Sequence, residues 1–438
     1  MGNGSFHLVG VAGTGMNALA QVLLGEGFAV TGSDRYLDQG RELGVTAKLR
    51  RAGVRLFPQD GSGVGPETRA VVASTAIEPG NPDLEAAARR GIPVRHRSEV
   101  LAELAEAGRP SVAVAGTSGK STTAGLAGWL LERLGADPTV VNGAVLLDWE
   151  TPEAVGNVRR GRSGPWIYEA DESDRSLLRY RPDWAVLTNV SADHFPLEEA
   201  RALFRRFAAQ VRRGIVARDD AAEPWRGFRP RLDAAGGRFV YRGVEFRVPL
   251  PGRHNAENAL AAVVLCERLG YPLERIAEAL PAFRGLRRRL ERVGSARGVT
   301  VFDDYAHNPA KIRASWEAVA PHHRRVLAAW RPHGFGPLAA LEGELRGLFG
   351  EMVRAGTVLH ILPVYYAGGT PSGTADPEAL ARDVGARWVP GLGELVERIA
   401  EEAREGDAVL LMGARDPDLP EAARRIVGAL GTRAPDAI

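Results

Sequence analysis

One loop in the sequence has the residue types that bind phosphate groups. It lies between a run of small apolar residues and a stretch typical of a helix. The loop and the first helical turn consist of Gly116, Thr117, Ser118, Gly119, Lys120, Ser121 and Thr122. In such a loop, backbone N–H groups and a helix N-terminus face the phosphates, the lysine reaches the terminal phosphates, and the serine hydroxyl ligates magnesium. A structural glycine turn would explain the glycines but not the lysine, so the pattern favours a nucleotide site.

The lysine is informative because the chain has only three, Lys48, Lys120 and Lys311. We expect Lys120 to stabilise phosphate charge and not to contribute to packing. The position five before Gly119 is Val114 and not glycine, so the loop departs from the full Walker pattern. An unrelated GTPase or kinase is therefore a less favoured interpretation.

Acidic residues follow two predicted strands. The segment Glu169–Asp174 contains four acids directly after one strand, and Asp193 and His194 follow the next. Ligands of open α/β sheets bind at the carboxyl ends of the strands. A solvated charge run is the commoner outcome for such a segment. Beside a phosphate loop, however, the acids offer oxygen ligands for magnesium, with His194 as a further ligand or orienting residue.

Two further clusters have weaker signals. The segment Asp303–Lys311 follows a predicted strand, and its Tyr-His-Asn group could merely cap the next helix. We favour function, with Asp304 holding a ribose hydroxyl and Lys311 balancing phosphate charge after domain closure. Near the N-terminus, the glycines at 10, 13 and 15 form a loose relative of the dinucleotide fingerprint, and Asp34 ends the next strand. That spacing predicts a nucleotide diphosphate, not specifically NAD.

The elements that position these residues form three successive α/β series, and in the first two a glycine-bearing turn follows the opening strand. The first series starts with a strand at 6–11, the second with a strand at 111–115, and the third with a strand at 299–303. A polar segment at 214–249 predicts a small β-rich insert. The predicted fold is α/β with three domains: a Rossmann-like domain at 1–108, a central P-loop ATPase-type domain at 109–294, and a second Rossmann-like domain at 295–438.

Composition excludes several classes of protein. With 438 residues, 25% charged and 45% hydrophobic, the chain is neither a disulfide scaffold nor disordered. The net charge of +2 gives no field for a nucleic acid or an anionic membrane. The single cysteine, Cys266, lies in an apolar helical run and predicts core packing. No leader and no apolar run near about 18 residues is found, so we expect a cytoplasmic protein.

Taken together and in order, these motifs resemble those of the Mur ligases, the ATP-dependent amide-forming enzymes of peptidoglycan precursor synthesis. The chain is most similar to the alanine-adding branch and the muropeptide branch. The resemblance also includes Ser74–Ile77, Pro251–Asn255 with Asn258, and, more loosely, Pro332 with His333. It implies a UDP-binding first domain, an ATP-binding middle domain and a C-terminal ligase domain, in a monomer or homodimer.

The resemblance implies a role for each group of residues. Lys120 and Ser121 would bind the ATP phosphates and Mg²⁺, and Glu169 and His194 would complete the metal shell. The remaining nucleotide contacts in the middle and last domains would come from Asn255, Asn258, Asp304 and a basic residue at 288 or 289, with Arg289 preferred. The UDP contacts would come from Gly10, Gly13, Gly15, Asp34 and Ser74. His333 is a weaker candidate for a catalytic role.

The reaction implied is transfer of the γ-phosphate to the carboxylate of UDP-N-acetylmuramate. The resulting acyl phosphate is attacked by the amino group of an L-amino acid, L-alanine first. No lysine lies between Lys120 and Lys311, so the carbamylated lysine of other branches is absent.

One departure from the alanine-adding branch leaves alternatives open. After Pro332 and His333, the positions that carry carboxylate-clamping arginines in that branch are Gly334 and Pro337. A peptide amine, another UDP-linked sugar acid, and a non-catalytic nucleotide-binding protein therefore remain alternatives. A dehydrogenase using NAD on the first domain would leave the phosphate loop unexplained.

Overall fold

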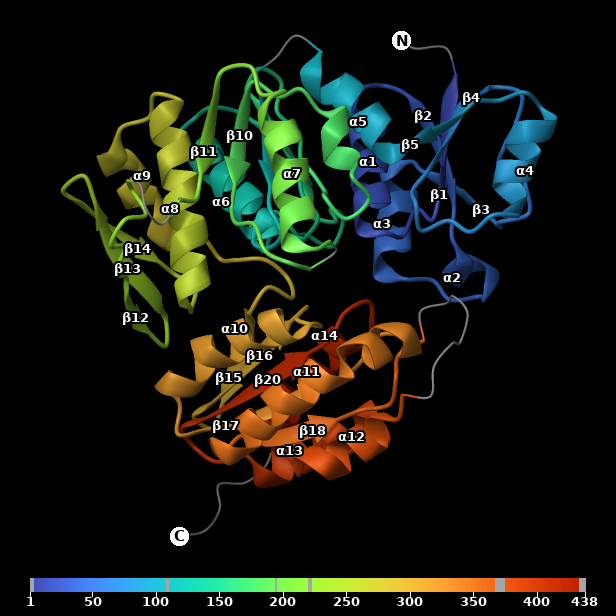
Figure 1. The fold of residues 1–438 in the computed structure, drawn as a ribbon. Coiled ribbons are helices and arrows are strands. Elements are labelled where there is room, and N and C mark those ends of the chain that lie inside the picture. The colour runs from blue at the N-terminus through green and yellow to red at the C-terminus, as the bar shows by residue number, and fades with distance from the viewer. Residues whose placement is uncertain (1–3, 108–109, 194, 220–222, 367–374, 433–438) are drawn as a thin grey trace. The chain divides into compact units, whose positions relative to one another are not determined.

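The computed structural model describes residues 4–107, 110–193, 195–219, 223–366 and 375–432. The chain forms two compact units, drawn together in Figure 1. The first comprises residues 1–229, 240–246 and 257–284, and the second comprises residues 230–239, 247–256 and 285–438. Among the helices that the structure describes, none has the length and apolar character needed to cross a lipid bilayer.

The first sheet is parallel throughout, with strand order β3-β2-β1-β4-β5. Its strands are β1 (Ser5–Val9), β2 (Ala29–Ser33), β3 (Arg55–Phe57), β4 (Thr68–Ala73) and β5 (Val94–His96). Its helices are α1 (Thr14–Gly25), α2 (Arg35–Asp38), α3 (Gly44–Ala52), α4 (Pro82–Arg89) and α5 (Arg97–Glu106). The predicted strand-helix-strand opening is confirmed. The short strand β3 was not predicted, because three residues are too few to show a period of two.

The second sheet has the order β11-β10-β6-β9-β7-β8, and only β8 is antiparallel to its neighbour. Its strands are β6 (Ser111–Ala115), β7 (Thr139–Val141), β8 (Val158–Arg159), β9 (Trp166–Glu169), β10 (Trp184–Leu187) and β11 (Gly214–Ala217). The helices are α6 (Lys120–Arg133), α7 (Leu197–Ala208), α8 (Arg253–Arg268) and α9 (Leu273–Ala279). Since β6 lies between β9 and β10, the phosphate loop and both acidic segments begin at adjacent strand ends.

The first two sheets belong to one unit because they share a hydrophobic core. One cluster of buried side chains includes Leu8 and Leu19 from the first sheet and its helix, and Trp166, Tyr168 and Phe207 from the second. Cys266 is fully buried, as predicted for core packing. The predicted β-rich insert is confirmed as a three-stranded sheet of β12 (Arg231–Asp233), β13 (Gly236–Tyr241) and β14 (Val244–Val248).

The sheet of the second unit has the order β15-β16-β20-β17-β18-β19. Its strands are β15 (Glu291–Ala296), β16 (Val299–Asp304), β17 (Arg325–Trp330), β18 (Val358–Ile361), β19 (Arg387–Trp388) and β20 (Asp407–Met412), and only β15 is antiparallel to its neighbour. Along β17, alternate side chains enter two separate cores. One core includes α10 (Pro309–Val319), α11 (Phe335–Arg354) and α12 (Pro377–Val384), and the other includes α13 (Leu392–Glu402) and α14 (Leu419–Thr432), so helices cover both faces (Figure 1).

Candidate active site

The predicted phosphate loop connects β6 to α6. Its two glycines have positive φ angles, 131° at Gly116 and 84° at Gly119. A Cβ atom on Gly116 would overlap the Thr188 hydroxyl, and one on Gly119 would overlap the Asn258 side chain. Both positions therefore require glycine, for backbone conformation and for space. The contact also brings Asn258, predicted to bind the nucleotide, against the loop.

The segment after β10 holds this loop from one side. The Thr188 hydroxyl and Asn189 Nδ2 both donate to the Ser118 carbonyl, at 2.6 and 2.9 Å. In return, the Ser118 N–H donates to Asn189 Oδ1 at 3.1 Å, and the Thr117 N–H donates to the Asn189 carbonyl at 3.0 Å. These bonds preorganise the loop. Because they occupy the N–H groups of Thr117 and Ser118, the donors for a phosphate come from the first turn of α6.

Lys120 forms a buried ion pair beside the loop. Its Nζ donates to the Gly116 carbonyl at 2.7 Å and lies 2.6 Å from Glu172 Oε2. Glu172 is 2% exposed, and its Oε1 has no hydrogen-bond partner among the described residues. Burial raises the pKa of Glu172, while the charge of Lys120 opposes that shift. At this distance from an ammonium group we take Glu172 as the carboxylate, so Lys120 is neutralised by the chain itself.

Ser121 and Glu169 provide two oxygen donors next to that lysine. The Ser121 hydroxyl donates to Glu169 Oε2 at 3.1 Å, and the Gly143 N–H donates to Glu169 Oε1. A Cβ atom on Gly143 would stand 2.8 Å from that same carboxylate oxygen, so glycine permits the approach. Asn142 Nδ2 donates to the Ser121 carbonyl at 3.0 Å and fixes the start of α6. The carboxylate and hydroxyl are thereby held at one point.

These two groups fit magnesium better than they fit a metal held by protein ligands alone. No group of three or more His, Cys, Asp or Glu side chains in the described ranges could hold a metal ion. Mg²⁺ is usually bound by one or two carboxylates, with substrate phosphates and water completing its shell. The Ser121–Glu169 pair meets that requirement. His194, predicted as a further ligand, lies outside the described residues.

Of the four acids at and just after the end of β9, Asp171 and Asp174 face away from the phosphate loop. Asp171 Oδ2 lies 3.5 Å from Arg97 Nη2, and Asp174 Oδ2 lies 3.4 Å from His96 Nε2, both at the start of α5. Burial would raise the pKa of Asp174, but hydrogen bonds from His96 and Ser176 outweigh burial and hold that pKa well below its usual value. Asp171 and Asp174 therefore tie the second sheet to the first.

The first-domain glycine loop is held by a hydrogen bond to Asp34. The Gly10 N–H donates to the Ser33 carbonyl at 2.9 Å, and the Ala12 N–H donates to Asp34 Oδ2 at 2.9 Å. Burial raises the pKa of Asp34, although the N–H groups of Ala12 and Tyr36 oppose the shift. Both oxygens of Asp34 thus hold backbone, one in the glycine loop and one at the start of α2.

Arg97, which was not predicted, and the predicted Ser74 turn flank this glycine loop. A Cβ atom on Gly15 would stand 3.0 Å from Arg97 Nη1, so a guanidinium lies beside the start of α1. A Cβ atom on Gly10 would stand 3.2 Å from Ile77 in the Ser74–Ile77 turn, in which the Ser74 hydroxyl accepts from the Ala76 N–H at 3.4 Å. Gly13 precedes α1 as its N-cap.

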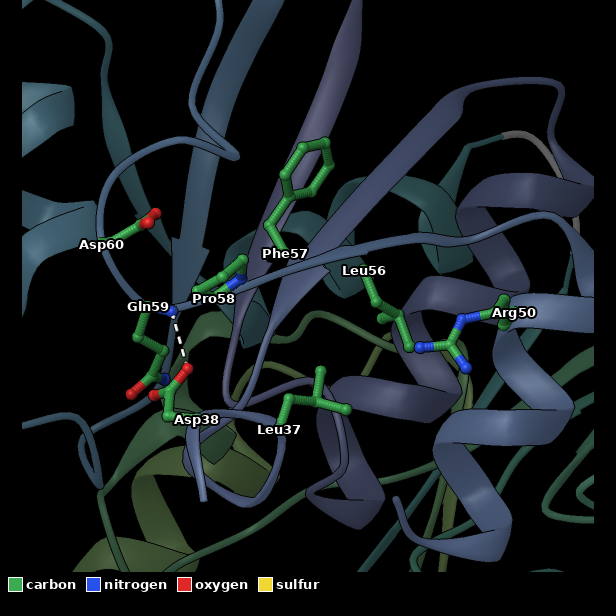
Figure 2. A pocket seen from close by; sticks show the side chains of 8 residues that line it. All are labelled: Leu37, Asp38, Arg50, Leu56, Phe57, Pro58, Gln59 and Asp60. Carbon is green, nitrogen blue, oxygen red and sulfur yellow. Dashed lines mark hydrogen bonds between the residues drawn. The ribbon is translucent and has the colours of Figure 1, made fainter. Parts of the chain in front are cut away.

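A cavity of about 640 Å³ opens at the carboxyl end of β3, next to α2, and was not predicted. Figure 2 shows its lining of apolar, aromatic and charged side chains: Leu37, Asp38, Arg50, Leu56, Phe57, Pro58, Gln59 and Asp60. The Gln59 N–H donates to Asp38 Oδ1 at 3.0 Å and closes one wall. Asp34 accepts a hydrogen bond from the glycine loop and also caps α2, which lies next to the cavity. This one residue therefore connects the loop and the cavity.

In the second unit, Asp304 ends β16 with both oxygens engaged. The N–H groups of Leu290 and Ala306 donate to it at 2.5 and 2.7 Å. Burial raises the pKa of Asp304, and Arg289 opposes the shift. The Arg289 guanidinium lies 5.4 Å from the centre of the Tyr305 ring. The two predicted residues therefore share one turn, although Asp304 already holds backbone.

His333, a predicted catalytic candidate, lies three residues beyond the end of β17. Its ring meets that of His307 edge to face, with centroids 4.9 Å apart. Burial first, and then the charges of Arg415 and Lys311, lower the pKa of His333 to about 4. The ring is therefore neutral at pH 7, and its unprotonated nitrogen can accept a hydrogen bond. Asn255, by contrast, donates its side chain to the Pro251 carbonyl at 2.7 Å.

Three family models match successive parts of the chain. The catalytic-domain model of the Mur ligase family matches residues 5–109, the Mur ligase middle-domain model residues 114–221, and the glutamate ligase domain model residues 288–415. The chain is 35% identical over 445 residues to the UDP-N-acetylmuramate--L-alanine ligase of Synechococcus sp. (strain JA-2-3B'a(2-13)), covering 94% of this chain and 90% of that relative. The chain belongs to the Mur ligase family.

Other members show how far the likeness of this Mur ligase extends. The UDP-N-acetylmuramate--L-alanine ligase of Acidothermus cellulolyticus is 37% identical over 453 residues, covering 94% of this chain and 92% of that relative. The solved UDP-N-acetylmuramate-alanine ligase of Thermotoga maritima has a TM-score of 0.79 at 26% identity, covering 97% of this chain and 98% of that one. These matches confirm the three-domain α/β architecture. The murein peptide ligase of Psychrobacter arcticus, at TM-score 0.69 and 22% identity, supports the fold alone.

Three residues with key positions in this Mur ligase were not singled out from sequence. Glu172 was read only as one of four acids, and Asn189 only as the end of a strand. Arg415 follows β20 by three residues. The available signal was local: each stands just beyond a predicted strand, where α/β sheets bind ligands.

Proposed function

We propose that this Mur ligase joins UDP-N-acetylmuramate to L-alanine in an ATP- and Mg²⁺-dependent reaction. The observation that carries the proposal is the juxtaposition of Lys120, Ser121 and Glu169 at adjacent strand ends. It supplies a cation, a helix N-terminus and oxygen donors for a triphosphate with its metal. The two relatives quoted above, both named as L-alanine ligases, support the choice of substrates.

Lys120 would change partners during the reaction. Before the nucleotide binds, Glu172 neutralises it at 2.6 Å. Phosphate oxygens would then take the place of Glu172 at the ammonium group, and the phosphate loop would hold them in line with the substrate carboxylate. The γ-phosphoryl group moves to that carboxylate and ADP leaves. The amino group attacks the acyl phosphate carbon, and inorganic phosphate departs from the tetrahedral intermediate as the amide forms.

Ser121 and Glu169 would hold Mg²⁺ on the phosphate oxygens. When bound, the metal neutralises the charge that develops on the transferred group. Asn142 and Gly143 keep Ser121 and Glu169 in place, so the two side chains are ordered before Mg²⁺ binds. Asn258 would contact the nucleoside.

The UDP part of the substrate would bind the first sheet. The glycine loop with Gly10, Gly13 and Gly15 would receive the diphosphate at the start of α1, beside Arg97. The cavity next to α2 has the size and the Phe57 ring expected for a base and sugar (Figure 2).

The proposal is tested by phosphate release with UDP-N-acetylmuramate, ATP and Mg²⁺, and a panel of amino acids. We expect release that requires both the acid and L-alanine, and a product mass equal to the condensed pair. Folded protein that releases no acid-dependent phosphate with any amine would refute the proposal. Thermal shifts with UDP-N-acetylmuramate, UDP-N-acetylglucosamine and UDP would separate the muramate acid from other UDP sugars.

A second candidate uses a peptide amine instead of L-alanine. It is favoured by Gly334 and Pro337, which replace arginines expected in the alanine-adding branch. A tripeptide in the same panel would distinguish the two by kcat/KM. A cytoplasmic location, and a monomeric or homodimeric state, stay predictions; light scattering measures the latter.

A further inference from the structure

Three strands of the second unit end at the same level of the sheet. In the register of β16, β20 and β17, Asp304 pairs with Met412 and Met412 pairs with Trp330. The backbone continues this contact, because the Gly413 N–H donates to the Asp304 carbonyl at 3.2 Å and the Arg331 N–H donates to the Met412 carbonyl at 3.0 Å. The loops that follow the three strands therefore start side by side.

The third residue beyond each strand end is a histidine or an arginine: His307 after β16, His333 after β17 and Arg415 after β20. The two histidine rings touch at 4.9 Å. His307 Nδ1 donates to the Tyr305 carbonyl at 2.9 Å, which in a neutral ring leaves the lone pair on Nε2. Burial and the nearby cations lower the pKa of His333 to about 4. A neutral imidazole nitrogen can accept a hydrogen bond from the N–H of an ammonium group.

The arginines of this region differ in whether the chain neutralises them. Arg288 lies 3.3 Å from Asp303 and also donates to the Asp416 carbonyl at 3.1 Å. Arg331 donates to Asp416 Oδ2 at 2.6 Å. Both guanidinium groups are thus engaged with side chains and carbonyl groups of the chain and hold the loops in place.

Arg415 is the exception. It is exposed, and no carboxylate of the described ranges lies within ion-pair distance of it. Its φ angle of 62° is left-handed, a conformation that side chains other than glycine adopt at a cost. An arginine at a position that suits glycine, with no carboxylate partner in the described ranges and with its charge acting on His333, points to an anionic ligand that also carries an ammonium group.

We infer that Arg415 binds the carboxylate of the incoming amine substrate, an α-amino acid or a peptide with a free C-terminus, while His307 and His333 face its amino group. This inference rests on the proposed ligase function and names the residue that replaces the arginines absent at Gly334 and Pro337. A phosphate would satisfy the guanidinium but would offer the imidazole nitrogens no N–H donor. The structure thereby separates an amine substrate from a nucleotide as the ligand of Arg415.

The test compares Arg415→Gly with a matched control, Arg297→Gly. Glycine adopts the left-handed conformation at both positions, so both variants are expected to fold. Arg297 precedes β16, at the opposite end of that strand. We expect Arg415→Gly to raise the KM for L-alanine about 10- to 100-fold, the loss of one charged hydrogen-bonded pair, with the KM values for ATP and UDP-N-acetylmuramate unchanged. Arg297→Gly should change none of the three.

L-alaninamide, which lacks the carboxylate, sharpens the result. The wild type should prefer L-alanine to the amide, and Arg415→Gly should lose that preference, with Arg415→Lys restoring part of it. An unchanged KM for L-alanine, or a raised KM for ATP instead, would overturn the inference while leaving the ligase function intact.

A measurement without turnover separates the inference from the ligase proposal. Phenylglyoxal modifies exposed arginines, and peptide mass spectrometry reads the modification at Arg415 in the wild type. With UDP-N-acetylmuramate and a non-hydrolysable ATP analogue present, L-alanine should slow this modification and L-alaninamide should not. Equal modification with and without L-alanine would contradict the inference even if no ligase activity were found.

Discussion

Two positively charged clusters, the first around Lys120 and the second around Arg415, lie at the carboxyl ends of parallel strands. They differ in whether a carboxylate of the chain pairs with the cation. In the first unit, Lys120 is paired with the buried Glu172 at 2.6 Å. In the second, Arg415 is exposed without a carboxylate partner among the described residues. A triphosphate with its metal brings several charges and can displace an internal partner. A small amino acid offers one carboxylate, and a cation without an internal partner binds it without that competition.

The largest effect is expected from Lys120→Ala, which removes the cation of the first cluster. Turnover should fall by about 10²- to 10³-fold or more, because phosphate charge loses its stabilisation. The ion pair with Glu172 adds an effect on stability that the sequence did not predict. The buried Glu172 carboxylate would lose its partner, at a cost of about 3 kcal/mol in unfolding free energy.

The double variant Lys120→Ala, Glu172→Gln separates these two effects. It should regain stability in urea denaturation but not phosphate release. If Lys120→Ala kept both activity and stability, the internal neutralisation of the first cluster would be wrong.

Glu169→Gln should lower kcat by about 10²-fold and raise the Mg²⁺ concentration needed for half activity, because a metal ligand loses its charge. Asp171→Asn is the matched control in the same segment. Asp171 faces Arg97 at 3.5 Å, so this change should cost at most about 1 kcal/mol of stability and little activity. Equal effects of both on the Mg²⁺ titration would show that the segment acts as a whole.

Gly119→Ala tests the crowding of the phosphate loop. The left-handed φ of 84° makes alanine cost about 1–2 kcal/mol, and overlap with Asn258 adds to it. Gly135→Ala has a φ of 85° with open space around the Cβ, so it measures the backbone cost alone. We expect only Gly119→Ala to raise the KM for ATP. If the two variants had equal stabilities and equal KM values for ATP, the Asn258 side chain would move aside without cost.

Asp303→Asn tests the ion pair between Asp303 and Arg288 in the second cluster, through the pH dependence of stability. Burial raises the pKa of Asp303 from 3.8 to about 7, against the pull of Arg288. The folded protein then binds this proton more tightly than the unfolded one, so the contribution of Asp303 to stability falls as pH rises from about 4 to about 7. The unfolding free energy of the variant relative to wild type should rise across that window. A flat difference would contradict the shift.

The smallest effect concerns the backbone at Arg415. Replacing it with glycine relieves the φ of 62° and should change stability by no more than about 1 kcal/mol. Arg297→Gly, at a φ of 51°, should do the same. A large loss with Arg415→Gly alone in thermal unfolding would mean that the guanidinium holds the fold and is not reserved for a ligand.

Much of the fold could be predicted from local patterns, since strand, turn and helix alternate with clear periods. The helix after the phosphate loop and the β-rich insert at 214–249 are confirmed. The short strands β3, β7 and β8 could not be predicted, because pairing with neighbours and not their own residues makes them strands. The joining of the first two sheets into one unit depends on a shared core, which no local pattern contains.

The sequence alone determined which chemical groups stand just after each strand: the lysine and serine at 120 and 121, the acids after β9, and the histidines of the last domain. Only the tertiary structure decided which of them meet. It turned Glu172 toward Lys120 but Asp171 and Asp174 toward α5, and it set His307 against His333. Those contacts join residues far apart in the chain, so they follow from strand order and register, which the sum of long-range packing selects and no single segment encodes.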